Sequence, residues 1–274
     1  MAYKRILTIQ DISCVGQCSM TVALPILSAC GHETCILPTA VLSTHTGGFG
    51  KPHVLQMNRE LDSICKHWQE NNIVFDAILV GYLGTVEAVS SVRRIIREML
   101  APGGLAIVDP AMADHGKLYS GFDQEYAQAM KALCDQADII LPNITEAAMF
   151  AGVPYCTEFD EAYICDLLKK LNHPAVILTG VGFREGETGA VIYCEGNPEF
   201  YHHPRIEKNF HGTGDMFAAC FTGALMQGKS YGESVQIAAD FVCKAIENTC
   251  NAPAHWYGVK FETALPDLIR MLQK

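Results

Sequence analysis

The chain has 274 residues, of which 49% are hydrophobic, and its formal net charge at pH 7 is −10. This length and composition allow one sizeable α/β domain with a large buried core, and the acidic balance without a basic block argues against a nucleic-acid partner. No apolar run reaches the roughly 18–20 residues of a membrane span, and no signal peptide precedes the first strand-like segment, so we expect a cytoplasmic protein with no membrane partner.

Short apolar runs recur along the chain, and each ends at a polar residue or a glycine. Such runs are typical of strands in a parallel sheet that is buried on both faces. In chain order, the predicted strands are 6–9, 77–80, 105–108, 139–141 and 176–178. Helical spacing of apolar residues predicts helices over 86–100, 124–136 and 161–171. Strands that alternate with helices indicate a doubly wound α/β fold.

The pattern changes towards the C-terminus. The segments 190–193 and 200–202, joined through a Gly-Asn-Pro turn, predict a β-hairpin. Three helices are predicted after it, over 215–227, 231–248 and 262–273. No repeat or linker divides the chain, so we expect a single domain over 1–274. The segment at about 33–55 fits a strand–helix crossover poorly and is predicted to be a small lid of short strands and a loop.

Five predicted strand ends carry polar residues. Ligands of open α/β sheets bind outside the carboxyl ends of the strands. One polar residue at a strand end can simply reflect a solvated loop, but five of them, with two carboxylates, favour a shared cleft. The five residues are Asp11, Tyr82, Asp109, Asn143 and Thr179.

The run Gly212-Thr213-Gly214-Asp215 precedes a predicted helix, because apolar residues recur with helical spacing from Phe217 to Leu225. Free backbone N–H groups and the helix dipole favour an anion at such a helix start. Asp215 fits an ordinary first-turn carboxylate, and it also fits a general base beside an anion hole, which phosphoryl transfer to an alcohol requires. The run lacks the lysine of a P-loop and does not follow the first strand, so neither a P-loop nor a dinucleotide fold fits.

The chain contains twelve cysteines, which we expect to be reduced thiols in an enzyme without a signal peptide. Zinc requires four ligands that usually come in close pairs. Cys14 and Cys18 form the closest pair, and the sequence contains no second close pair that would complete a set of four ligands. His202 and His203 resemble a metal pair, but neighbouring residues of a strand point to opposite faces. We therefore expect no zinc site.

The segment from Gly212 to Ala219 resembles the C-terminal signature of the ribokinase superfamily. Four further segments narrow the resemblance to the pyridoxal/pyridoxamine kinases, in the family's order and over nearly the whole chain: 43–46, 81–85, 109–112 and 142–146. The resemblance implies a three-layer α/β/α sandwich with a mostly parallel central sheet and a small lid. It implies ATP-dependent phosphorylation of the 5′-hydroxymethyl group of pyridoxal, pyridoxamine or pyridoxine with Mg²⁺. It leaves room for K⁺, and it suggests a homodimer that pairs through the lid.

The resemblance also implies roles on the phosphate side of the site. Asp215 would take the proton of the vitamer hydroxyl, and the anion hole would consist of Gly212, Thr213 and Gly214. Mg²⁺ needs only one or two carboxylates at such a site, and the matching positions are Asp109 and Glu146, the latter directly or through a water. The positions that match nucleotide contacts are Asn143, Thr179 and Asp114. Asn143-x-x-Glu146 equally fits a helix capping box.

On the vitamer side, His45 and Thr46 match lid contacts to the pyridine ring, and Tyr82 lines the same pocket. His45 would otherwise be an ordinary loop histidine, and Tyr82 a core residue. The family usually has serine at the position of Asp11, where it touches the ring substituents. A carboxylate there could bind the cationic aminomethyl group of pyridoxamine, the protonated ring nitrogen or a hydroxyl. We hypothesise a shift towards pyridoxamine.

Other kinases and a non-catalytic protein are the alternatives. The hydroxymethylpyrimidine kinases of thiamine synthesis commonly carry cysteine at the position of Asp215. Sugar kinases of the superfamily usually show a Gly-Gly…Asn element near the N-terminus, which residues 16–20 do not supply. A vitamer-binding protein on the same fold is the alternative of another class, and an intact Asp215 and Glu146 speak against it.

Overall fold

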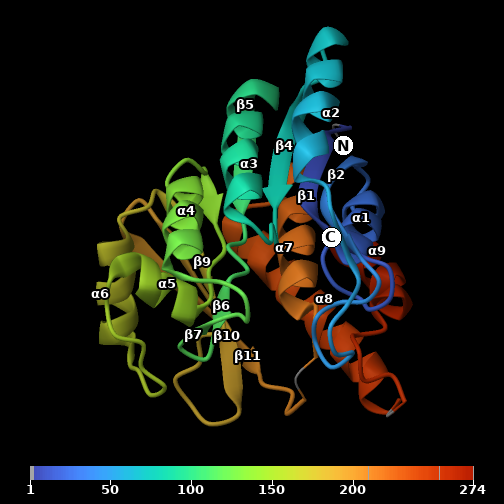
Figure 1. Ribbon diagram of the computed structural model, residues 1–274. Helices are drawn as coiled ribbons and strands as arrows, with labels where there is room; N and C mark the ends of the chain where they lie inside the picture. Colours follow the sequence, from blue (N-terminus) through green and yellow to red (C-terminus); the bar gives the residue numbers. More distant parts are fainter. Residues whose placement is uncertain (1–2, 209, 253, 274) are drawn as a thin grey trace.

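A computed structural model describes residues 3–208, 210–252 and 254–273, and its main element is one nine-stranded sheet in the order β11-β10-β9-β8-β5-β4-β1-β2-β3 (Figure 1). The strands are β1 (Arg5–Ser13), β2 (Glu33–Leu42), β3 (Val54–Gln56), β4 (Phe75–Val80), β5 (Leu100–Val108), β8 (Ile139–Ile140), β9 (Ala175–Thr179), β10 (Glu187–Cys194) and β11 (Asn197–Pro204). The six strands from β9 to β2 are parallel, whereas β3, β10 and β11 pair antiparallel at the edges. All five predicted parallel strands and the predicted hairpin are confirmed.

Helices cover both faces of the sheet and form two separate cores with it. One face carries α2 (Asn58–Glu70), α3 (Val86–Met99), α4 (Gln124–Cys134), α5 (Ile144–Ala151) and α6 (Glu161–Leu171). The other carries α1 (Met20–Ala29), α7 (Thr213–Met226), α8 (Tyr231–Cys250), the 3₁₀ turn η1 (Phe261–Ala264) and α9 (Leu265–Leu272). In β1, Leu7 and Ile9 face the first core and Ile6 faces the second, as the two-residue period of a strand requires. The three-layer sandwich is confirmed.

The segment expected to form a lid requires a correction in its first half. Glu33–Leu42 is not a lid but β2, which runs parallel to β1 in the main sheet and buries Leu37 completely. Pro38 interrupts the strand pattern in the sequence. It is tolerated because β3 pairs only with Ala40 to Leu42, so this part of β2 lies at the sheet edge. Only the loop 43–53 leaves the sheet, and in Figure 1 it descends beside the segment that follows α8.

One small feature completes the fold near the carboxyl edge of the sheet. A two-stranded flap, β6 (Ala113–Asp114) and β7 (Lys117–Leu118), follows β5.

Three helices, α1, α2 and α5, are present in addition to those that the spacing predicted, and α1 includes Pro25. All twelve cysteines are free thiols. Among the described residues, no helix has both the length and the apolar character that crossing a membrane requires.

Candidate active site

Three of the predicted site residues, Asp11, Asp109 and Asp215, meet where the chain order of the sheet reverses, between β1 and β4. From β1 the chain passes to β2 on one side and then returns to β4 on the other, which opens a crevice at the carboxyl ends of the strands. A small pocket at this point is lined by Gln10, Gly81, Asp109 and Asp215. The structure therefore brings together carboxylates from the ends of β1 and β5 and from the start of α7.

The N-terminus of α7 has the form of an anion site. Gly212 is the N-cap and has φ 81°, and a Cβ at this position would lie 1.9 Å from the carbonyl oxygen of Gln17. Only glycine fits both the backbone angle and the close approach. Gly214 is exposed, and its hypothetical Cβ would lie 3.9 Å from Oδ2 of Asp109. The predicted anion hole therefore opens directly onto a carboxylate.

Asp215 lies in the first turn of α7 and is partly exposed, so a substrate hydroxyl can reach it. Its Oδ2 accepts the backbone N–H of Ser19 at 2.8 Å. Burial raises the pKa of Asp215 to about 6, the Ser19 N–H opposes this rise, and the charge of Asp11 adds to it. At pH 7 the group is an ionised carboxylate that is much more basic than an ordinary aspartate, as a general base requires.

Asp11 is a buried carboxylate beside the partly exposed Asp215. Only 3% of Asp11 is exposed, and its Oδ2 accepts the hydroxyl of Ser13 at 3.0 Å. Burial raises the pKa of Asp11, and its charge in turn raises the pKa values of Asp215 and Tyr82. A register shift between Gln10 and Ile12 in the pairing with β2 marks a bulge at this residue. Among the described residues, no lysine, arginine or histidine forms an ion pair with Asp11 or Asp215.

Asp109 follows β5 and stays partly exposed beside Gly214. Its Oδ1 accepts the N–H of Ala111 at 3.1 Å. Burial and the charges of Glu146 and Asp215 raise its pKa well above the usual value. A carboxylate surrounded by negative charge and next to an anion hole suits a hard cation that also binds phosphate, so the residue fits Mg²⁺.

Asn143 and Glu146 form the capping box of α5, and they also hold the flap. Glu146 accepts the N–H of Asn143 at 2.9 Å through Oε2 and that of Met112 at 2.8 Å through Oε1. The amide of Asn143 donates to the carbonyl of Ala113 at 2.7 Å. Burial raises the pKa of Glu146 to about 7 despite these N–H groups. Since Glu146 is 1% exposed and already bound, a metal at this point would be reached through water.

The remaining predicted residues of the phosphate side lie on three elements, which are β9, the flap and the start of α7. Thr179 ends β9 and forms a parallel bridge with Asn143, and its hydroxyl lies 3.4 Å from the carbonyl oxygen of Pro142. Asp114 is exposed on the flap. Thr213 follows the N-cap of α7, and its hydroxyl donates to the carbonyl of Phe210 at 3.4 Å.

His45 forms two hydrogen bonds with the backbone in this structure, and its contact with the pyridine ring stays a prediction. Its Nε2 donates to the carbonyl of Tyr257 at 2.9 Å, and its Nδ1 accepts the N–H of Gly47 at 2.9 Å. Both nitrogens are therefore occupied by the backbone, and burial lowers its pKa, as a neutral ring requires. Thr46 is exposed on the loop. The ring of Tyr82 lies 5.5 Å from that of Phe122 and forms an aromatic wall near Asp11.

Three residues near Asp215 were not indicated as site residues by the sequence pattern: Gln10, Gln17 and Ser19. Gln10 is buried and lines the pocket, and its amide donates to the hydroxyl of Thr8 at 2.7 Å. A buried glutamine directly before Asp11 at a strand end is the signal that could have indicated it. Gln17 contacts the site through its backbone carbonyl, so its side-chain type carries no such signal, whereas Ser19 contacts Asp215 through its N–H and Asp11 through its side chain.

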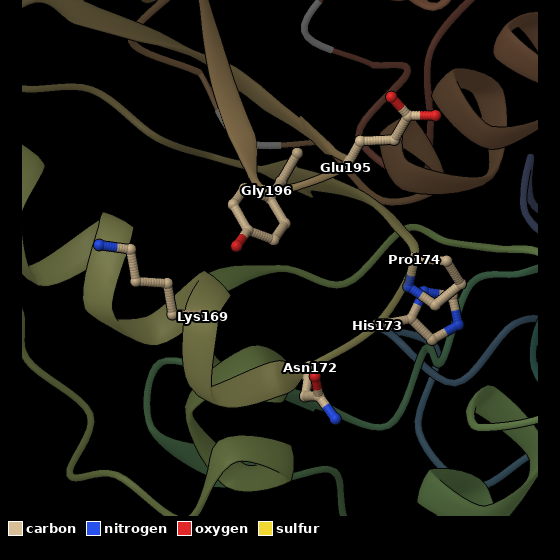
Figure 2. Close-up of a pocket in the computed structure, with 7 residues that line it drawn as sticks. Lys169, Asn172, His173, Pro174, Glu195 and Gly196 are labelled. Carbon is tan, nitrogen blue, oxygen red and sulfur yellow. The ribbon is translucent and has the colours of Figure 1, made fainter.

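A larger cavity of about 420 Å³ lies elsewhere, between the end of α6 and the turn that joins β10 to β11 (Figure 2). It includes His173 and Pro174, just before β9 begins, and so lies at the amino end of that strand. None of the predicted site residues lines it. Among the described residues, no three His, Cys, Asp or Glu side chains form a metal cluster.

Comparisons with known proteins agree with this geometry. The model of the phosphomethylpyrimidine kinase family matches residues 25–259. The pyridoxal kinase of Lactobacillus plantarum is 32% identical, with 98% of each chain covered and a TM-score of 0.91. A Bacteroides thetaiotaomicron kinase, named for phosphomethylpyrimidine and crystallised with pyridoxal, is also 32% identical, with 97% and 96% covered and a TM-score of 0.91.

A hydroxymethylpyrimidine/phosphomethylpyrimidine kinase of Bacillus subtilis is 28% identical over 216 residues, which are 77% of either chain. Relatives with either substrate in their names therefore match at similar identity. The family match spans most of the chain, and the structural matches span nearly all of it. The chain therefore belongs to the pyridoxal/phosphomethylpyrimidine kinase family of the ribokinase-like fold.

Proposed function

We propose that this protein transfers the γ-phosphate of ATP to the 5′-hydroxymethyl group of a vitamin B6 vitamer. The single observation that carries the proposal is Asp215: a carboxylate of pKa about 6 in the first turn of α7, beside a glycine N-cap that admits no side chain. Base and anion hole stand within one helical turn, so one hydroxyl group can lose its proton while the transferring phosphoryl is stabilised.

The reaction follows from these positions. Asp215 accepts the proton of the substrate hydroxyl as the hydroxyl oxygen attacks the γ-phosphorus, and the bond from this phosphorus to the β–γ bridging oxygen breaks to release ADP. The N–H groups from Gly212 to Gly214 face the developing negative charge at the helix start. Asp109, with Glu146 through water, would hold Mg²⁺, which neutralises phosphate charge when bound. Asn143 and Glu146 keep the flap in place, and Asp114 and Thr179 line the path of the triphosphate. K⁺ is a further candidate ligand of the triphosphate site.

The ring substituent next to the alcohol decides the preferred substrate. Asp11 and Asp215 place two carboxyl groups side by side, and no described cation pairs with either of them. An N–H donor beside the hydroxymethyl group therefore suits this part of the site better than a carbonyl oxygen. Pyridoxamine carries an aminomethyl group at this position, and pyridoxal carries an aldehyde. Tyr82 forms one wall for the ring. Thr46 stands on the loop above, and His45 supports that loop.

Hydroxymethylpyrimidine is the second candidate substrate, because it also carries an amino group next to its hydroxymethyl group. The experiment is an ADP-release assay with pyridoxal, pyridoxamine, pyridoxine and hydroxymethylpyrimidine. Turnover of the B6 vitamers supports the proposal, and turnover of hydroxymethylpyrimidine alone identifies the other kinase. Tight vitamer binding without turnover of any alcohol would identify a binding protein and contradict the proposal.

The proposal extends to the assembly and its location. Ile36, Val54 and Leu55 are 37%, 41% and 58% exposed on β2 and β3, at the edge of the sheet. Exposed apolar residues on an edge strand favour pairing with another chain, and we assign the partner as a second copy, in line with the expected homodimer. The twelve free thiols fit a reducing compartment such as the cytoplasm.

A further inference from the structure

Gln17 lies in the loop between β1 and α1, and its amide group makes three hydrogen bonds. Its Nε2 donates to both carboxylate oxygens of Glu262, at 2.7 and 2.9 Å. Its Oε1 accepts Nε2–H of His255 at 2.7 Å. The amide has only this orientation, because a carboxylate accepts and cannot donate. The side chain thus joins loop 14–19 to two segments that follow α8 in the chain.

Two glycines allow other segments to pack closely on Gln17. A Cβ at Gly258 would lie 2.8 Å from Cβ of Gln17, and one at Gly212 would lie 1.9 Å from its carbonyl oxygen. Gly212 is the N-cap of α7 and belongs to the proposed anion hole. Gln17 is therefore held by the C-terminal segment through its side chain, and it packs on the anion hole through its backbone.

The same loop contains a strained residue whose N–H binds Asp215. Ser19 has φ 53° and ψ −126°, a combination that non-glycine residues rarely adopt. Such strain persists only where the surroundings hold it. The Ser19 N–H donates to Asp215 at 2.8 Å, and among the described residues Asp215 accepts no other hydrogen bond. The strained conformation therefore aims one donor at the proposed base.

We propose that Gln17 is a positioning residue for phosphoryl transfer. Its three hydrogen bonds add to the backbone bonds of Cys14 and Val15 in fixing loop 14–19. The fixed loop holds the Ser19 N–H against Asp215 and the Gln17 carbonyl against Gly212. Without those bonds Ser19 relaxes, and Asp215 loses the donor that orients it. The inference rests on the proposed function, because positioning has an effect on turnover only if Asp215 is the base.

The test replaces Gln17 by methionine, which keeps the length of the side chain and removes its hydrogen bonds. We expect kcat to fall roughly tenfold or more while the KM for ATP stays within about threefold, because the base acts in the transition state and not in nucleotide binding. Hydrogen exchange of the Ser19 amide should become faster in the same variant. The second readout does not depend on activity.

Two controls separate positioning from general loss of structure. Gln69→Met removes a comparable bond, from Gln69 to Glu98 at 2.8 Å, far from the site between α2 and α3, and should leave kcat unchanged. Glu262→Gln keeps an acceptor for Gln17 and should behave as the wild type, whereas Glu262→Ala should behave as Gln17→Met. All variants are compared at a temperature where circular dichroism shows that they are folded. If Gln17→Met does not fold, Glu262→Ala serves as the test variant in its place.

The wild type is assayed first with all four alcohols. If it turns over none of them, the proposed function fails, and exchange at Ser19 still tests whether Gln17 holds the loop. If the wild type is active, a Gln17→Met kcat within threefold of it overturns the positioning role. An increase in the KM for ATP without a decrease in kcat, or an equal loss in Gln69→Met, overturns it as well.

Discussion

At the start of α7, Asp215 is subject to two opposite influences on its charge. Burial and the nearby Asp11 raise its pKa, while the Ser19 N–H stabilises the ionised form. The balance leaves a carboxylate that is ionised at pH 7 but holds a proton below about pH 6. An aspartate in water would lose its proton near pH 4 and would be a weaker base. The environment of Asp215 therefore matters as much as its identity.

As the pH is lowered beneath about 6, we expect kcat/KM for the alcohol to decrease by about tenfold per pH unit, because protonated Asp215 cannot accept the substrate proton. Asp215→Asn should lower kcat by about 10²- to 10⁴-fold with little change in ATP affinity. A pH–rate profile and an ATP titration measure both effects. If Asp215→Asn retained the same acid limb, another group would be the base.

Asp11→Ser should shift preference from pyridoxamine towards pyridoxal, because it removes the carboxylate next to the ring substituent and restores the serine usual in the family. The measurement is kcat/KM for both vitamers in the two proteins. Ser13→Ala is the matched control, since it removes the hydrogen bond to Asp11 but keeps the charge. If the ratio of kcat/KM for pyridoxamine to that for pyridoxal is the same in Asp11→Ser and in the wild type, Asp11 does not determine the specificity.

At the scale of elements, the two ends of α7 contain glycines with the same backbone requirement and different surroundings. Gly212 has φ 81°, and a Cβ there would lie 1.9 Å from a neighbouring carbonyl oxygen, whereas Gly228 has φ 93° and nothing within 4 Å of such a Cβ. Replacement by alanine costs about 1–2 kcal/mol at either position, because a side chain disfavours this angle. Only Gly212 carries the additional steric conflict.

Gly212→Ala should therefore abolish turnover and destabilise the fold more than Gly228→Ala, which should keep near wild-type kcat. Urea unfolding compares the two free energies of unfolding, and the ADP-release assay compares the activities. Similar activity in the two variants would show that the close approach of Gln17 to Gly212 is not needed for the anion hole.

The capping box of α5 shows how one motif serves two purposes. Asn143 and Glu146 satisfy the free N–H groups at the helix start and also bind Met112 and Ala113 of the flap. The sequence allowed a cap or a phosphate and metal contact at this motif. The structure shows the cap and adds the flap, because Glu146 accepts the cap N–H through Oε2 and the N–H groups of Met112 and Ala113 through Oε1.

At the scale of the whole molecule, buried carboxylates link stability to pH. The folded pKa of Asp215 is raised from 3.8 to about 6, and that of Glu146 from 4.5 to about 7. Between about pH 4 and pH 7 the folded protein therefore binds more protons than the unfolded chain, so its stability falls as the pH rises through this window.

We expect a larger free energy of unfolding at pH 5.5 than at pH 8, measured with urea. Asp215→Asn should reduce the difference, because it removes one of the titrating groups. Asp135→Asn, a change of an exposed carboxylate on the surface, should leave the difference in place. Equal stability of the wild type at both pH values would contradict the assignment.

The proposed dimer is tested at the same scale. Leu55→Lys places a charge on the exposed edge strand β3 and should give a monomer by sedimentation equilibrium. Ile269→Lys changes a residue that is 42% exposed on α9, on another element, and should leave the dimer intact. A wild type that is monomeric at micromolar concentration would contradict pairing through β2 and β3.

The sequence by itself determined the elements whose signal is local. Uniformly apolar strands, helical spacing and the glycine-rich helix start are properties of neighbouring residues, so the parallel strands, the hairpin, α7 and the cluster of residues at the strand ends could be predicted. Pro38 obscured β2, because strand pairing and an edge position are settled by partners far away in the chain.

Only the tertiary structure decided which groups surround each site residue. The raised pKa of Asp215, the occupied nitrogens of His45, the flap bonds of Glu146 and the link from Gln17 to Glu262 all join residues from distant segments. Burial, charge and hydrogen-bond geometry depend on three-dimensional neighbours, which residue type and spacing along the chain do not specify.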